Sequence, residues 1–412
     1  MIKLLVIADG RSLNTIGWLK GLQGRPNIEV HLISTYPAEK IEGLASQHLV
    51  PVAFGNLGGV SRKVGNSTSE AISLIGTIKN QLFRFAATFR SQFMKLRNII
   101  GPLTLPFYAR QVKKIIDEIQ PDIIHGLRIP FEGLLAFQSM DDQALVISIW
   151  GNDLTFHASA SKIMGKWAEK VLQKCDGLIA DASRDIRLAK DWGLNESAPT
   201  LVVPGGGGIP QKSANISPVD LSALLGEVID QNRPIIVNPR GFRPGSVRND
   251  TFFKAIPEVI KQFPKALFIC PPMSGEPQAE EWIRVLDISS SVRLLPLIPH
   301  DVMWGLFKGA DITTSISEHD GTPNSLLEAM ACGSYPIAGD IESVREWVED
   351  GKNGSLVDPG DSSMLADAII SALKNKKHRG RAAKMNAKII EERASRNSVA
   401  MQVETFYQSI LK

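Results

Sequence analysis

The chain repeats one pattern twice: short apolar runs of strand character alternate with segments of helical periodicity, before and after a glycine-rich break. The strands of the first series are expected at 2–8, 29–34, 123–125, 145–150, 175–180 and 200–203. A helical pattern at 16–22 separates the first two. Because strands that alternate with helices form βαβ units, this series predicts a parallel sheet with helices on its faces.

A second series of the same kind follows Pro204–Gly208, which ends the first pattern. Its strands are expected at 234–237, 266–270, 292–295, 312–316, 334–338 and 354–357. A chain of 412 residues exceeds what one core organises, so two domains of about 200 residues are expected. We therefore predict an N-terminal Rossmann-like domain over 1–205, a linker over 206–232, a C-terminal Rossmann-like domain over 233–395 and a final helix over 396–412 that returns to the first domain.

The composition is that of a soluble globular protein, with 43% hydrophobic and 22% charged residues. A net charge of +3 is too small to indicate a nucleic-acid partner. The three cysteines lie far apart, as reduced thiols of a cytosolic protein do. No secretory signal precedes the first strand, and no run approaches the ~18 apolar residues of a spanning helix, so we expect a cytoplasmic protein.

The sequence offers no metal-binding pattern. Its seven histidines show no metal-ligand spacing, and no Asp-x-Asp motif is present to hold a divalent ion on a diphosphate. We therefore expect chemistry without a metal and without any other cofactor.

The segment Asp320–Gly333 is the most informative single stretch of the chain. It follows the β-branched strand run at 312–316 and reads as a helix with strong boundary signals. Thr322 suits the N-cap, Pro323 the first helical position, and Gly333 the position after the helix that needs a positive φ. A strand that runs directly into a helix start places free backbone N–H groups at the carboxyl end of a sheet, where α/β folds bind anions.

Two carboxylates flank this predicted anion site. Asp320 lies in the loop, and Glu328 lies about a turn and a half into the helix. Taken singly, each is explained as a solvated residue, since charged side chains are mostly exposed. A carboxylate repels phosphate but accepts hydrogen bonds from sugar hydroxyls. Phosphate at the helix start and hydroxyls on the carboxylates together describe a nucleotide sugar.

A basic loop follows the first strand of the second series. Arg240, Arg243 and Arg248 lie there among glycine and proline residues. Guanidinium groups at the carboxyl end of a strand suit a diphosphate, which they can hold by bidentate hydrogen bonds. The alternative is a solvated basic loop without a ligand.

Segment Asp320–Gly333 resembles the acidic-x₇-Glu segment of retaining glycosyltransferases of the GT-B architecture, especially family 4 (group 1). That family usually has Glu where this chain has Asp320. The Gly-Arg-x₄-Lys segment of the family is matched by Arg243 and by Arg248 in the lysine place, with Phe242 in place of the glycine. The resemblance implies an α/β fold of two facing Rossmann-like domains with a cleft between them.

The resemblance also assigns roles to residues of the second domain. Asp320 would contact the transferred sugar, Glu328 the ribose hydroxyls, and Arg243 with Arg248 the donor pyrophosphate. The further donor-binding residues it implies are Gly321, Thr322, Asn324 and Ser325.

Polar residues that follow strands of the first series are candidates for contact with the acceptor or the transferred sugar. They are Gly10, Asn14, His125, Trp150, Asn152 and Asp153. Relatives often have His-Gly-x-Asp where this chain has Trp150 to Asp153, so this half departs from the family pattern. His125 is equally well explained as a structural histidine.

Residues 71–116 contain eight basic and no acidic side chains. Within 75–100, isoleucine, leucine and phenylalanine recur every three or four residues and form one apolar stripe. Such a basic amphipathic helix is typical of an element at an anionic membrane surface, here the inner face of the membrane. The alternative, a helix that packs its stripe on its own domain, remains open.

The resemblance implies a retaining, metal-independent hexosyltransferase. It would move a hexose-type sugar from a UDP- or GDP-sugar to a glycan, a lipid-linked acceptor or a small molecule, as in polysaccharide or glycolipid biosynthesis. Two alternatives remain: a non-catalytic sugar-nucleotide-binding partner or sensor, and a GT-B-fold nucleotide-sugar epimerase.

Overall fold

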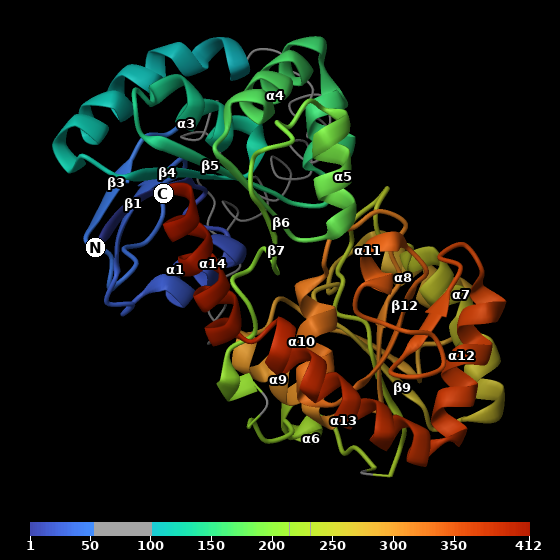
Figure 1. Cartoon of the computed structure of the whole chain (residues 1–412). Helices are drawn as coiled ribbons and strands as arrows, with labels where there is room; N and C mark the ends of the chain where they lie inside the picture. Colours follow the sequence, from blue (N-terminus) through green and yellow to red (C-terminus); the bar gives the residue numbers. More distant parts are fainter. Residues whose placement is uncertain (53–100, 214, 231) are drawn as a thin grey trace, which may run out of the picture. The chain divides into compact units, whose positions relative to one another are not determined.

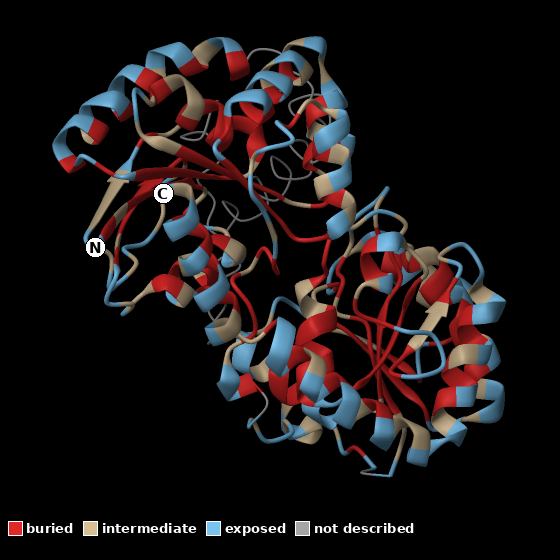
Figure 2. Cartoon of the chain, viewed as in Figure 1, coloured by how far each residue is buried: buried red, intermediate tan, exposed pale blue. Residues whose placement is uncertain are grey.

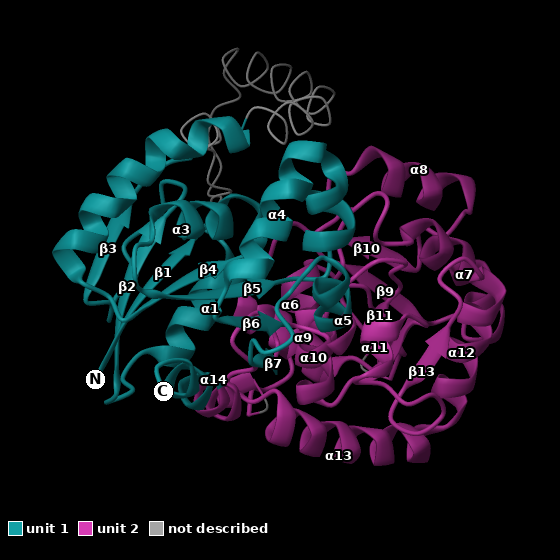
Figure 3. Cartoon of the chain, turned by 45° about the horizontal axis from the view of Figure 1, so that its top comes forward, with its two compact units in different colours: residues 1–180, 185–202, 403–412 teal, residues 181–184, 203–402 magenta. Residues whose placement is uncertain are grey.

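Figure 1 shows the computed structural model, which describes residues 1–52, 101–213, 215–230 and 232–412. The basic stretch at 75–100 lies outside the described residues, so its contact with a membrane stays a prediction. Two compact units are coloured separately in Figure 3. Unit 1 consists of Met1–Ala180, Asp185–Val202 and Val403–Lys412, and unit 2 of Asp181–Arg184 and Val203–Gln402.

Unit 1 is built on a seven-stranded sheet in the order β3-β2-β1-β4-β5-β6-β7. All of its neighbouring strands pair in parallel. The strands are β1 (Ile2–Ala8), β2 (Ile28–Ser34), β3 (Ser46–Leu49), β4 (Ile123–Leu127), β5 (Ala144–Ile149), β6 (Gly177–Ala180) and β7 (Thr200–Val202). The central strands are buried along nearly their whole length, as expected where helices cover both faces of a parallel sheet.

The helices of unit 1 connect these strands. They are α1 (Leu13–Leu22), a helix at 101–119, α3 (Leu134–Ser139), α4 (Lys162–Lys174) and α5 (Ser183–Asp191). Short irregular helical segments follow two of the strands: η2 (Ile129–Gly133) after β4, and η3 (Asp153–His157) with η4 (Ala158–Ala160) after β5. Ser161 caps α4 by accepting a hydrogen bond from the Met164 amide at 3.1 Å.

Unit 2 is built on a six-stranded parallel sheet in the order β10-β9-β8-β11-β12-β13. Its strands are β8 (Ile235–Val237), β9 (Leu267–Cys270), β10 (Val292–Leu294), β11 (Ile312–Ser315), β12 (Tyr335–Gly339) and β13 (Ser355–Val357). Its helices are α6 (Leu221–Leu225), α7 (Asn249–Gln262), α8 (Pro277–Val285), α9 (His300–Gly309), α10 (Asn324–Cys332), α11 (Glu342–Arg345), α12 (Ser362–Lys374) and α13 (Lys376–Arg393).

The predicted linker and final helix both contain regular secondary structure. Residues 206–232 belong to unit 2 and contain α6 together with the short turn η5 (Gln211–Ser213). Helix α14 (Arg396–Ile410) belongs to unit 2 as far as Gln402 and to unit 1 from Val403 onward.

Each unit encloses its own apolar core. Figure 2 shows buried residues concentrated on the strands and on the inner faces of the helices. The main core of unit 1 gathers side chains from β1, β4, β5 and α4, and that of unit 2 from β8, β9, α7 and α12. Within the described ranges, no helix has both the length and the apolarity needed to span a bilayer.

Both sheets reverse their direction of growth once. In unit 1 the chain proceeds from β1 through β2 to β3 at one edge, and then returns to place β4 on the other side of β1. In unit 2 it proceeds from β8 through β9 to β10, and then places β11 on the other side of β8. At such a switch point, α/β folds commonly bind their ligands at the carboxyl ends of the strands. Ligand sites are therefore expected at the loops that follow β1 and β4 and at those that follow β8 and β11.

The predicted N-cap of α10 is wrong by one residue. The helix begins at Asn324, and Pro323 is the N-cap. Thr322 does not cap it because its hydroxyl has other partners: it donates to the carbonyl oxygen of Asp181 and accepts from Trp347 Nε1 at 3.0 Å. At the other end, Gly333 has a φ of 89°, the left-handed conformation that the sequence predicts there.

Candidate functional site

The loops after β8 and β11 contact each other at the switch point of unit 2. Val247 and Ser317 form an isolated antiparallel bridge. The Arg248 amide donates to the carbonyl oxygen of Ile316 at 2.9 Å, and the Ser246 hydroxyl donates to that of His319. These backbone contacts hold the basic loop against the loop that carries Asp320.

Arg240 and Asp320 form an ion pair at this junction. Arg240 Nη2 donates to Asp320 Oδ2, and Nη1 donates to Ser325 Oγ at 3.3 Å on the first turn of α10. The side chain of Arg240 is only 6% exposed and that of Asp320 is 20% exposed. The buried Nε of Arg240 has no hydrogen-bond partner among the described residues. A buried guanidinium with an unused donor, beside a partly exposed carboxylate, can serve both an anion and a hydroxyl group.

Sequence reasoning did not select Arg240 for the pyrophosphate, because the family spacing points to Arg243. The signal that could have found it is its position directly after β8, at the carboxyl end of the strand. Arg240 lies three positions before Arg243, so a motif of fixed spacing selects only the later arginine.

The two arginines that the sequence did select lie further along the same loop. Arg243 is solvent-exposed, but surrounding protein atoms displace enough water to lower its pKa, and the charge of Arg240 lowers it further. Arg248 binds Asp250 through Nε at 2.8 Å and Nη2 at 2.9 Å, and it also pairs with Glu318. These hydrogen bonds raise the pKa of Arg248 and balance its charge before any ligand binds.

Glu328 lies one turn after Ser325 on α10, so the two side chains share one face of the helix. Its side chain is only 9% exposed. Its Oε1 is 2.8 Å from Nε2 of His300, the first residue of α9. His300 was not predicted, because nothing in the sequence shows that the start of α9 meets the middle of α10.

The remaining predicted donor residues surround the start of α10. Asn324 lies beside Gly206. A Cβ added to Gly206 would approach the side-chain nitrogen Nδ2 of Asn324 to 2.7 Å. A Cβ on Gly321 would lie 2.3 Å from a carboxylate oxygen of Asp181, so only glycine fits there. Thr322 is buried and held by the two hydrogen bonds described above.

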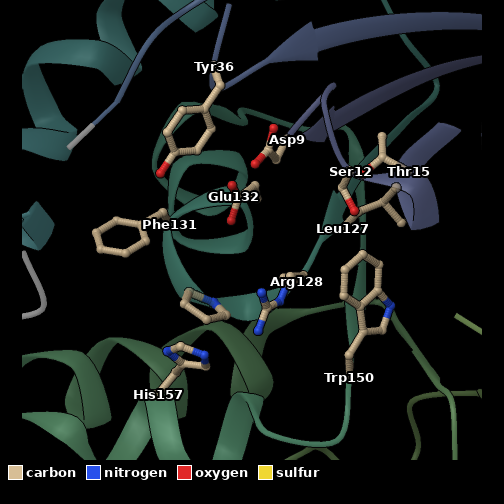
Figure 4. Close-up of a pocket in the computed structure, with 11 residues that line it drawn as sticks. Asp9, Ser12, Thr15, Tyr36, Leu127, Arg128, Phe131, Glu132, Trp150 and His157 are labelled. Carbon is tan, nitrogen blue, oxygen red and sulfur yellow. The ribbon is translucent and has the colours of Figure 1, made fainter. Parts of the chain in front are cut away.

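Unit 1 has a cavity of about 160 Å³ at the β1/β4 switch point (Figure 4). Its walls come from the segments that follow β1, β2, β4 and β5. The lining residues are Asp9, Ser12, Thr15, Tyr36, Leu127, Arg128, Pro130, Phe131, Glu132, Trp150 and His157. Aromatic rings, carboxylates and a guanidinium therefore face one space, a combination that suits the apolar faces and the hydroxyl groups of a carbohydrate.

Arg128 is held in place on the wall of this cavity. Its φ of 99° is unusual for a residue other than glycine, and such a conformation persists only where the surroundings enforce it. Asp153 supplies that constraint: it is fully buried and accepts from Arg128 Nε at 3.0 Å and Nη2 at 2.5 Å. Asp153 also accepts from the Trp150 amide at 3.0 Å, and the guanidinium lies 5.3 Å from the centre of the Trp150 ring.

Of the predicted first-domain residues, Trp150 lines the cavity, and Asp153 supports the lining residues Arg128 and Trp150 by accepting hydrogen bonds from them. Asn14 on α1 and Asn152 before η3 are half-buried and are not among the residues that line the cavity. At Gly10 a Cβ would come within 2.7 Å of Ser34 Oγ, so this position requires glycine.

His125 lies in the core of unit 1 instead. It is fully buried on β4, with Nδ1 at 2.7 Å from Tyr407 Oη and Nε2 at 2.8 Å from Ser148 Oγ. Burial lowers the pKa of His125 to about 3, so the ring is neutral at physiological pH. Its place is explained by packing with α14, without any ligand.

Glu132 was not predicted, and no local signal marks it within the apolar run around Phe131. It is buried on η2 and accepts from Thr35 Oγ1 at 2.9 Å. Figure 4 shows its carboxylate near Asp9, on the wall of the cavity. For the described part of the chain, no group of three or more histidine, cysteine, aspartate or glutamate side chains is arranged to hold a metal ion.

Comparison with known families identifies both halves of the chain. The model of the family described as glycosyl transferases group 1 matches residues 229–389, and the model described as glycosyl transferase 4-like matches 86–182. These matches show a glycosyltransferase similar to those of group 1. The first match spans the β8 and β11 loops and α10, so it includes the switch-point residues of unit 2.

Curated relatives of the chain include two phosphatidyl-myo-inositol mannosyltransferases. That of Mycolicibacterium smegmatis is 24% identical over 75% of this chain and 76% of its own length. That of Mycobacterium leprae is 36% identical, but over only 21% of this chain. The matches to the M. leprae enzyme and to N-acetyl-alpha-D-glucosaminyl L-malate synthase of Bacillus anthracis span 22% and 32% of those relatives' lengths.

Solved structures confirm the predicted GT-B fold class. A sucrose-phosphate synthase from Thermosynechococcus elongatus superimposes with a TM-score of 0.70 at 14% identity, over 99% of both chains. The Anabaena protein HepE, solved in complex with UDP-glucose, has a TM-score of 0.69 at 16% identity and covers 99% of this chain and 100% of its own. At these identities the likeness is one of fold.

Proposed function

We propose that the chain is a retaining glycosyltransferase that binds a nucleotide-sugar donor at the β8/β11 switch point of unit 2 and its acceptor in the cavity of unit 1. The observation that carries the proposal is the Arg240–Asp320 pair beside Ser325 at the start of α10. It combines a cation for phosphate with a carboxylate for a sugar hydroxyl, at the place where α/β sheets bind ligands.

Each part of the donor is assigned to the residues whose charge suits it. Arg240 and Arg243 hold the pyrophosphate, with Arg248 as a weaker contributor because two carboxylates already neutralise it. The backbone at the start of α10, Asn324 and Ser325, adds N–H donors. On the same helix, Glu328 accepts from the ribose hydroxyls, and Asp320 contacts the transferred hexose.

The proposed reaction follows from this assignment of donor groups to residues. The bond between the sugar C1 and the diphosphate oxygen breaks, and the nucleoside diphosphate leaves with the bonding pair, stabilised by the arginine charges. The acceptor hydroxyl attacks C1 from the same face, and its proton passes to an oxygen of the departing phosphate. Retention results without a protein nucleophile, and no metal is required.

The proposed acceptor site is the unit 1 cavity. Glu132 and Arg128 would bind acceptor hydroxyls, and Trp150 would contact an apolar sugar face. A UDP- or GDP-hexose as donor and a glycan, lipid-linked or small-molecule acceptor fit the relatives, which include mannosyltransferases named for phosphatidyl-myo-inositol. The structural neighbour solved with UDP-glucose supports a nucleotide-sugar donor.

The proposal is tested by screening UDP- and GDP-sugars by thermal shift, since a ligand of the folded state raises stability by mass action. The best donor is then incubated with and without acceptor mixtures, and the anomeric configuration of the product is read by NMR. Transfer with retention supports the proposal. Binding without transfer or hydrolysis would indicate the sensor alternative, and a free epimeric nucleotide sugar would indicate the epimerase.

The arginine assignments make a graded prediction. Arg240→Ala and Arg243→Ala should each weaken nucleoside diphosphate binding by roughly 1.5–3 kcal/mol, the scale of a hydrogen bond to a charged group. Arg248→Ala should have a smaller effect, because its charge is already balanced by Asp250 and Glu318. Isothermal titration calorimetry with UDP and GDP measures the three affinities.

Arg284→Ala is the matched control for these variants, because Arg284 on α8 is exposed and pairs with Glu281 on the same helix. It should bind diphosphate like the parent. Parental affinity in Arg240→Ala and Arg243→Ala as well would remove the pyrophosphate assignment.

A further inference from the structure

His300 reaches a buried carboxylate from the protein surface. Its side chain is 51% exposed, while that of Glu328 is 9% exposed, and their Nε2 and Oε1 atoms are 2.8 Å apart. The pair joins the first residue of α9 to the middle of α10. Glu328 is therefore fixed by a group that solvent and ligands can reach.

The surroundings of the pair are positively charged. Arg396 on α14 and Lys212 on η5 are the charged groups that act on His300 besides Glu328. The buried Nε of Arg396 has no hydrogen-bond partner among the described residues, and attraction to Glu328 opposes the lowering of its pKa by burial. Beneath the imidazole lies the ring of Trp304, with 4.8 Å between ring centres and an angle of 31° between planes. Lys212 Nζ lies 5.3 Å from the centre of the Trp304 ring.

We propose that His300 is a positioning residue for donor binding: it holds the Glu328 carboxylate in the orientation that accepts the ribose hydroxyls, and its protonation makes donor affinity depend on pH. This inference rests on the assignment of Glu328 to the ribose in the proposed function. The two residues approach from different helices, so the hydrogen bond between them fixes a rotamer that α10 alone leaves free.

The direction of the pH dependence follows from the contacts. The hydrogen bond to Glu328 raises the pKa of His300, whereas burial and the charges of Arg396 and Lys212 oppose that rise. Below this pKa the imidazolium donates a charge-assisted hydrogen bond, and it also attracts the anionic donor. Above it the neutral ring can still donate from Nε2, but more weakly. Donor affinity should therefore be highest at low pH and fall as the pH rises through the pKa of His300.

The experiment compares the full chain with His300→Gln, which keeps a neutral hydrogen-bond donor on a half-exposed position. Dissociation constants for UDP and GDP are measured by calorimetry at pH 6 and pH 8.5. The parent should bind about fivefold more tightly than His300→Gln at pH 6, the difference between a charged and a neutral hydrogen bond, and the gap should close at pH 8.5. The terminal phosphate of the diphosphate itself titrates near pH ~6, but it affects both proteins alike.

His48→Gln is the matched control, since His48 lies in unit 1 and its Nε2 contacts Ser46 Oγ of its own strand. It should show the parental pH profile. A second measurement does not depend on the glutamine variant: NMR titration of the His300 imidazole should give a higher pKa in the parent than in Glu328→Gln.

The outcomes separate the two claims. If Glu328→Gln weakens diphosphate binding but the parent and His300→Gln differ equally at both pH values, His300 has no positioning role and the donor site remains. Equal His300 pKa values in the parent and Glu328→Gln would overturn the inference in the same way. If the parent binds neither UDP nor GDP at any pH, the proposed function fails and this inference with it.

Discussion

Asp320→Asn is expected to lower turnover by about two to three orders of magnitude while nucleoside diphosphate affinity changes far less. An interaction made chiefly in the transition state has this signature, and losing one such polar contact typically costs a factor of about 10² to 10³. The variant should also lose roughly 2–3 kcal/mol of unfolding free energy, because Arg240 is left buried without its charged partner. Steady-state kinetics, diphosphate titration and urea unfolding measure the three effects.

Asp320→Glu restores the residue that the family usually carries, in a site fitted to the shorter side chain. It should keep the ion pair with Arg240 and retain partial activity, well above that of Asp320→Asn. Asp340→Asn is the control: Asp340 follows β12 and forms an exposed ion pair with Arg345 through two hydrogen bonds, and its loss should leave turnover unchanged. Parental turnover in both Asp320 variants would show that this carboxylate does not contact the transferred sugar.

Unit 1 is expected to lose stability as the pH falls below about 6.5, on account of His125. Unfolded histidine has a pKa of about 6.5, whereas burial lowers that of folded His125 to about 3. Between these values the unfolded chain takes up a proton that the folded chain does not, so the stability present above pH ~6.5 is lost progressively toward pH ~3. The linkage amounts to about 5 kcal/mol across that window.

The measurement is urea unfolding at several pH values for the parent and His125→Gln. The variant loses part of the hydrogen bonding to Tyr407 and Ser148, so it starts lower, but its stability should fall less steeply with acid. Buried and paired carboxylates add the same acid dependence to both proteins, and the difference between them isolates His125. Parallel curves would show that the ring becomes charged within the folded state.

The sequence predicted what depends on local pattern and on chain order. Alternating strands and helices indicated two parallel sheets, and the glycine after α10 indicated where that helix ends. The start of α10 was misplaced by one residue, since the Thr322 hydroxyl is taken by Asp181 and Trp347, partners distant in the sequence. Capping preferences describe an isolated helix and do not include such tertiary competition.

In the candidate sites, too, local pattern was predictable and tertiary contacts were not. Asp320 and Glu328 stand at a recognisable spacing, so they could be singled out, but their partners could not. Arg240 was passed over because motif spacing assumes a loop of fixed length. His300 and Glu132 have no local sequence signal, because the partner of each lies on an element distant in the sequence: Glu328 for His300 and Thr35 for Glu132. For His125, a ligand-facing and a structural role look identical in sequence, and only burial on β4 separates them.

The central claim, that a nucleotide-sugar donor binds at the β8/β11 switch point, is tested most directly by hydrogen exchange followed by mass spectrometry, with and without saturating UDP or GDP. Binding should protect backbone amides in peptides that cover Arg240 to Arg248 and Gly321 to Glu328, because these contain the proposed phosphate and ribose contacts. Peptides from β13 and α12 of the same unit should exchange at unchanged rates. Protection confined to unit 1, or affinity for either diphosphate with no protection at the switch-point loops, would contradict the account.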